Sequence, residues 1–184
     1  RTVLEKLKKD GKARFIGFST HRNMDTLLNA AAEDKLYDVV LAAYNFKHDE
    51  SVTRAVNNAA KAGIGVMAMK TQAGGYEDSG MGNLSPHQAA LRWVLSNKSV
   101  TNTIPSMVTF DQVDENIQVM DTKLGWFDRK TLYQYGNIID KELCRFCDLC
   151  DGQCPSGVSV PDVNRCVMYA DGYRDMALAQ ANYL

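Results

Sequence analysis

The sequence has no long apolar run, no long run of one charge and no visible targeting segment. No stretch approaches the roughly eighteen consecutive apolar residues of a membrane-spanning helix, so we expect no membrane span. Lysines and arginines number 21 and acidic residues 22, a net charge of −1. A chain with this balance lacks the basic surface that attracts nucleic acids or anionic membranes. These absences argue against both classes of partner.

Apolar spacing alternates between the strand period and the helix period over the first 122 residues. Short apolar strands are expected at residues 13–19, 38–46, 64–70 and 100–105. Helices are expected at residues 1–9, 24–35, 50–63, 86–97 and 109–122, with Ser85 and Thr109 as N-caps of the last two. Near-continuous apolar strands of this kind are typical of parallel sheets that are covered on both faces. The sequence therefore predicts an α/β fold of four βα units, compatible with an open sheet or with half of a (β/α)8 barrel.

The sequence changes character near residue 121. An aromatic-rich helix is expected at residues 126–143, and two short helices broken at Asp171-Gly172 are expected within residues 160–184. We therefore divide the chain into a partial barrel at residues 1–122 and a small helical tail at residues 123–184.

Four of the five cysteines lie close together in the tail, at Cys144, Cys147, Cys150 and Cys154, and Pro155 follows them. This spacing matches the ligand run of bacterial ferredoxins, in which two intervening residues let successive thiolates reach successive irons of a cube. Disulfide frameworks belong to small secreted proteins with wider spacing, and structural zinc prefers two separated pairs. The run therefore predicts a 4Fe–4S cluster.

The fourth ligand of this cluster is either Cys154 or Cys166. In two-cluster ferredoxins the last cysteine of such a run serves the other cluster, but no second run exists here. Cys166 lies in a predicted helix, where a lone cysteine is more often a buried apolar residue. We therefore favour Cys154.

Several motifs together resemble the carboxy-terminal half of aldo/keto reductases, in particular the subgroup with an appended ferredoxin-type segment. They read "GKARFIGFSTH", "AAYNF", "GIGVMAMK", "HQAALRWVLSN" and "VTNTIPSMVTFDQVDEN". The resemblance implies barrel strands five to eight over residues 1 to about 120, with NAD or NADP at the carboxyl ends of the strands. It also implies hydride transfer between nicotinamide and a small carbonyl or alcohol substrate. The family's Asp–Tyr–Lys–His tetrad lies on earlier strands, so we assign no catalytic residue and expect this chain alone to be inactive.

The resemblance also implies cofactor contacts at particular positions. Ser19 occupies the position that meets the nicotinamide carboxamide, and Met69 and Lys70 stand where a stacking tyrosine is frequent. Gly74 would let backbone amides approach the pyrophosphate.

The adenosine end of the cofactor site departs from the family pattern. Ser106 and Gln112 replace the Lys and Arg that grip the 2′-phosphate, which weakens the expected preference for NADP. Glu115 and Asn116, which face the adenine in the family, are retained. Among the histidines, His21 is expected at the strand ends and His87 on the surface.

The sequence thus predicts a nicotinamide-dependent oxidoreductase with an iron–sulfur cluster. The cluster either passes single electrons to or from a redox protein or only fixes the helical tail to the barrel. The rival interpretation is a non-enzymatic electron-transfer or scaffold protein with a relic barrel. An iron–sulfur protein usually matures in the cytoplasm, which is the expected compartment. Periplasmic export through a lost twin-arginine signal is the alternative.

Overall fold

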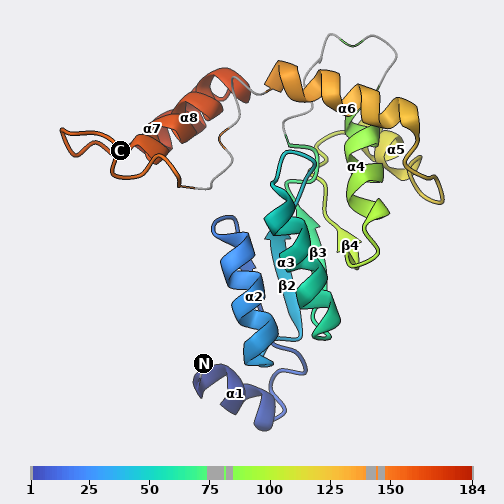
Figure 1. Cartoon of the computed structure of the whole chain (residues 1–184), viewed down its shortest axis with the longest axis vertical. Helices are drawn as coiled ribbons and strands as arrows, with labels where there is room; N and C mark the ends of the chain where they lie inside the picture. Colours follow the sequence, from blue (N-terminus) through green and yellow to red (C-terminus); the bar gives the residue numbers. More distant parts are fainter. Residues whose placement is uncertain (1, 74–80, 82–84, 140–143, 145–147, 184) are drawn as a thin grey trace. The chain divides into compact units, whose positions relative to one another are not determined.

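The computed structural model describes residues 2–73, 81, 85–139, 144 and 148–183, and Figure 1 shows their helices and strands. The chain packs as two compact units. The first comprises residues 1–71 and 93–106, and the second comprises residues 72–92 and 107–184. The predicted division of the chain at residue 122 into barrel and tail stays a prediction.

The order of helices and strands confirms the predicted alternation. The first unit contains α1 (Thr2–Lys9), β1 (Gly17–Thr20), α2 (Met24–Asp34), β2 (Val39–Ala43), α3 (Glu50–Lys61), β3 (Gly65–Met69) and β4 (Asn102–Thr103). The second contains α5 (Phe110–Ile117), α6 (Trp126–Ile139), α7 (Val160–Val167), the π-helical turn η1 (Met168–Gly172) and α8 (Met176–Tyr183). Helix α4 (Pro86–Ser96) contributes residues to both units.

The four strands form one parallel sheet in the order β1-β2-β3-β4. Parallel neighbours need a crossover. Helix α2 lies between β1 and β2, α3 between β2 and β3, and α4 between β3 and β4. Strand β4 is shorter than predicted. The flanking residues nevertheless continue its pairing with β3, because Thr101 N–H donates to Val66 O at 2.8 Å and Ile104 N–H donates to Ala68 O at 2.9 Å.

One face of the sheet forms the core of the first unit. Val40, Ala42, Val66 and Ala68 are fully buried, in the same apolar cluster as side chains of α2 and α3. Residues between them point to the opposite face, where Val39, Leu41 and Met67 are only half-buried. Ala43 and Met69, which point to that same face at the carboxyl ends of β2 and β3, are buried, so among the described residues this face is covered only in part.

Gly17 allows β1 to approach β2. It pairs with Val39, and a Cβ on Gly17 would lie 2.6 Å from Val39 Cγ1 and 2.8 Å from Val39 O. Gly65 pairs with Val39 from the other side, yet a Cβ there would lie 3.6 Å from its nearest neighbour, Asp38 O. Both glycines thus pair with Val39, but only Gly65 has room for an added methyl group.

We predict that Gly17→Ala lowers the free energy of unfolding by about 1–3 kcal/mol, because the backbone of β2 must shift to admit the methyl group. Gly65→Ala, the control, is expected to change it by less than about 1 kcal/mol, or to stabilise the strand. Urea unfolding monitored by circular dichroism measures both. Equal effects of the two substitutions would contradict the packing described for β1 and β2.

Candidate functional site

The carboxyl ends of the parallel strands meet at one edge of the sheet, and Asn45 ties this edge together. Its amide Nδ2 donates to Lys70 O, after β3, at 2.9 Å, and its Oδ1 accepts Lys47 N–H at 3.0 Å. The backbone N–H of Asn45 donates to His48 Nδ1 at 3.2 Å. Asn45 is buried, and Lys70 takes the left-handed conformation, with a φ of 54°. The edge is therefore a defined polar surface rather than a set of loose loops.

His21, which follows β1, lies at the same edge, as expected. The pKa of its imidazole is lowered, first by partial burial and then by the positive charge of Lys70. A neutral imidazole beside an ammonium group can donate or accept hydrogen bonds to a polar ligand, while Lys70 attracts negative charge.

The residues predicted to contact the nicotinamide half of the cofactor differ in their exposure. Ser19 and Lys70 are exposed at the edge, whereas Met69 is buried and its carbonyl accepts Tyr44 N–H at 3.0 Å. Ser106 is exposed. Gly74 lies outside the described residues. These cofactor contacts stay predictions.

Gln112 has a structural role that the sequence did not indicate. Thr109 is confirmed as the N-cap of α5, because its side chain accepts Gln112 N–H at 3.4 Å. Gln112 Oε1 reciprocates by accepting Thr109 N–H at 3.3 Å, which completes a capping box. The side chain that stands where the family carries an arginine thus stabilises the start of its own helix.

Glu115 and Asn116 also make internal hydrogen bonds. Asn116 Oδ1 accepts Gln72 Nε2 at 3.0 Å, with both residues buried, and the Glu115 carboxylate accepts the Ser85 hydroxyl. Ser85 is confirmed as the cap of α4, because Gln88 N–H donates to its Oγ at 3.1 Å. These bonds tie α5 to the start of α4.

His87 is buried, so its predicted surface position is wrong. It is 5% exposed, and its ring meets the edge of Tyr135 of α6 with centroids 5.9 Å apart. Burial lowers the pKa of His87, and the negative charge of Glu115 partly offsets this effect. Burial also raises the pKa of Tyr135 to about 12. The sequence analysis expected His87 at the surface because it stands at the start of a helix. Tyr135 of α6, which is distant in sequence, packs against it instead.

The described residues of the cysteine run, 144 and 148–154, form no helix or strand, and we call them the cysteine loop. Cys144, Cys150 and Cys154 are half-buried in it, while Cys147 lies outside the described residues. Backbone N–H groups point at one of these sulfurs. Hydrogen bonds from Val158, Ser156 and Gly157, in that order of effect, lower the pKa of the Cys154 thiol. Successive N–H groups that converge in this way form an anion-binding nest, which favours the thiolate that binds metals.

Helix α7 lies against this loop through residues that the sequence analysis missed. Asn164 Nδ2 donates to Cys150 Sγ at 3.5 Å. Arg165 forms ion pairs with Asp162 and, at 3.7 Å, with Asp148. The available signal was the spacing of Arg165, four residues after the buried Pro161 and three before the buried Met168. A basic residue on the buried face of a short helix marks a buried ion pair.

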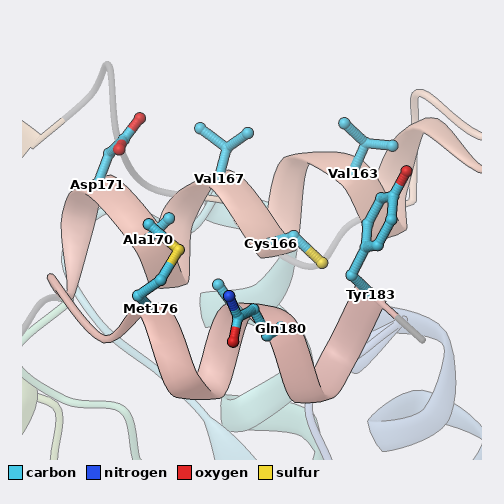
Figure 2. A pocket seen from close by; sticks show the side chains of 9 residues that line it. Val163, Cys166, Val167, Ala170, Asp171, Met176, Gln180 and Tyr183 are labelled. Atoms are coloured by element: carbon cyan, nitrogen blue, oxygen red, sulfur yellow. The ribbon is translucent and has the colours of Figure 1, made fainter.

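Cys166 faces a different environment. It lines an apolar groove of about 440 Å³ between α7 and α8, together with Val163, Val167 and Tyr183. Figure 2 shows its sulfur directed into the space between the two helices. Within the described ranges, no three His, Cys, Asp or Glu side chains lie close enough together to hold a metal. Cys144, Cys150 and Cys154 are among these residues, so the structure does not bring the three sulfurs together. Cys147 lies outside the described residues, and the four-cysteine ligand set stays a prediction.

Comparisons with known proteins identify the fold. No family model matches the chain, and neither does any curated protein sequence. Among solved structures it is similar to the holo form of aldo-keto reductase AKR11C1 from Bacillus halodurans, with 16% identity and a TM-score of 0.57 over 73% of this chain and 54% of that chain. It is also similar to the apo form of the same reductase, with 15% identity and a TM-score of 0.55 over 73% of this chain and 55% of that chain.

The chain therefore spans about half the length of these reductases. Its parallel four-stranded sheet has the fold of part of an aldo-keto reductase barrel, and at this identity the likeness concerns the fold alone. Throughout the described ranges, every helix is too short or too polar to traverse a bilayer.

We predict that acid weakens the packing of α4 against α6. Because the pKa of His87 is lower in the folded chain than its ordinary value of 6.5, the unfolded state binds more protons as the pH falls. Stability is then complete above about pH 6.5 and declines below it. His87→Phe, which keeps an aromatic ring beside Tyr135, is expected to reduce this decline.

The measurement is the free energy of unfolding at about pH 7.5 and about pH 5.5 for both proteins. The control is the change in the free energy of unfolding between about pH 7.5 and pH 9. The His87 imidazole is neutral in both the folded and the unfolded chain over this interval, so it contributes nothing to that change. An identical acid-induced decline in the variant would show that His87 does not carry it.

Proposed function

We propose that the chain is part of a nicotinamide-dependent oxidoreductase of the aldo/keto reductase type that holds a 4Fe–4S cluster through Cys144, Cys147, Cys150 and Cys154. A bound nicotinamide would supply a hydride to the carbonyl carbon of a small substrate, or remove one from an alcohol, and the cluster would supply single electrons. A redox protein is the partner that such electrons require. The ferredoxin spacing, together with the N–H groups around Cys154, carries the proposal.

The cysteine loop supports the cluster through its chemistry. Hydrogen bonds from three backbone N–H groups stabilise the Cys154 thiolate, and Asn164 donates to the sulfur of Cys150. Hydrogen bonds to sulfur are a main determinant of how iron–sulfur ligands bind and at what potential the cluster works. Cys166 lies instead in the groove between α7 and α8, which favours Cys154 as the fourth ligand.

The edge of the sheet supports the nicotinamide site. Barrel enzymes place their active sites at the carboxyl ends of the strands, and here this edge carries exposed Ser19 and Lys70 beside His21. We assign to Ser19 a hydrogen bond to the carboxamide and to Lys70 an attraction for the charged part of the cofactor. Either NAD or NADP would fit this assignment.

The partly covered face of the sheet supports a larger barrel. Val39, Leu41 and Met67 are apolar and only half-buried there. We propose that this face is part of the inner wall of a barrel that is closed by strands other than these four. The catalytic tetrad would lie on those strands, so the 184-residue chain alone would not reduce carbonyls.

One observation favours the alternative of an electron-transfer or scaffold protein without nicotinamide. Gln112 and Asn116, predicted to contact the adenosine half, already use their side-chain oxygens in internal hydrogen bonds. Fluorescence titration of the iron-containing chain with NADH and with NADPH decides between the two. Binding of either supports the oxidoreductase, and binding of neither supports the alternative.

We predict that the anaerobically purified chain is brown and contains about four iron atoms and about four acid-labile sulfides. Cys154→Ser is expected to lose most of both. Cys166→Ser is the matched control, since Cys166 lines the groove between α7 and α8, and it is expected to keep them. A colourless protein that contains zinc would contradict the cluster. Loss of iron in the Cys166 variant with retention in the Cys154 variant would reverse the ligand assignment.

A further inference from the structure

Two adjacent side chains of α7 reach the cysteine loop at neighbouring points. Asn164 is exposed and places Nδ2 3.5 Å from Cys150 Sγ. Arg165 is 7% exposed and places its guanidinium 3.7 Å from the carboxylate of Asp148, between the second and third cysteines of the run. The loop thus meets the helix through one hydrogen bond to sulfur and one buried ion pair.

The charge balance around Arg165 makes its position informative. One guanidinium faces two carboxylates, Asp148 of the loop and Asp162 of its own helix. Removal of the positive charge would leave the half-buried carboxylate of Asp148 and the exposed carboxylate of Asp162 without their cation, and Asp148 lies in the cysteine run itself. Arg165 therefore both fastens the loop and keeps the surroundings of Cys150 from becoming more negative.

We propose that α7 is the positioning element of the cysteine loop: Arg165 fastens the loop through Asp148, and Asn164 donates to the sulfur of Cys150. The two side chains then determine how firmly the loop holds its cluster and at what potential the cluster is reduced. The inference rests on the cluster proposed above. Its physical reason is that reduction adds negative charge, which a nearby cation and an N–H donor to sulfur stabilise.

The test is a redox titration of the anaerobic, whole chain after reconstitution with ferrous iron and sulfide, followed by EPR and visible absorbance. At the wild-type midpoint potential, Arg165→Met is expected to lower the ratio of reduced to oxidised cluster about tenfold, which is ~59 mV for a one-electron couple. Asn164→Ala, on an exposed side chain, is expected to lower the ratio about threefold without loss of fold.

Arg165→Lys separates charge from geometry. It keeps the positive charge but loses the planar fork that binds a carboxylate. We expect a ratio within about twofold of wild type, together with faster release of iron to a chelator. If Arg165→Met does not fold, as judged by circular dichroism, Asn164→Ala and Arg165→Lys still decide the question.

Arg54→Met is the matched control, because Arg54 also pairs with an acidic residue, Glu50 at 3.5 Å, but lies in the first unit. It is expected to change neither the potential nor the release of iron. If the wild-type chain takes up no iron and sulfide, the proposed cluster fails and this inference fails with it. If the wild type holds the cluster and the α7 variants match it in potential and iron release, the inference alone is overturned.

Discussion

Parallel pairing of β2 with both of its neighbours is the interaction on which the first unit depends. Hairpins cannot join parallel strands, so α2 and α3 must cross over between them and cover one face. The same pairing brings every strand's carboxyl end to one edge, where Asn45 fastens the ends of β2 and β3. The polar edge that carries His21 and Lys70 is thus a consequence of strand direction.

The second unit orders its cysteine loop by different means. The loop contains no strand or helix among its described residues, 144 and 148–154. Backbone N–H groups gather around Cys154, and α7 adds a hydrogen bond to Cys150 and an ion pair to Asp148. Polar contacts therefore hold this loop in place, whereas apolar burial stabilises the sheet.

Local patterns predicted most of the fold but little of the surroundings of the candidate sites. The βα alternation and the caps Ser85 and Thr109 were confirmed, because each depends on a few adjacent residues. The helix break predicted at Asp171-Gly172 falls just after them, at residues 173–175, because both residues belong to η1. His87 was misplaced because its cover comes from α6.

The ion pair of Arg165 with Asp148 and the capping role of Gln112 were missed for related reasons. The first joins residues that are distant in sequence. In the capping box, the Gln112 side chain binds the start of its own helix, whereas the family resemblance had assigned it to the cofactor. Spacing along the chain specifies which residues are available, whereas tertiary packing decides what each one contacts.

X-ray absorption at the iron and zinc edges of the anaerobically purified chain tests the central claim most directly. The account predicts iron surrounded by sulfur alone, with other iron atoms as its next neighbours, and no bound zinc. Zinc ligated by the cysteine sulfurs, or iron ligated only by nitrogen and oxygen, would contradict it.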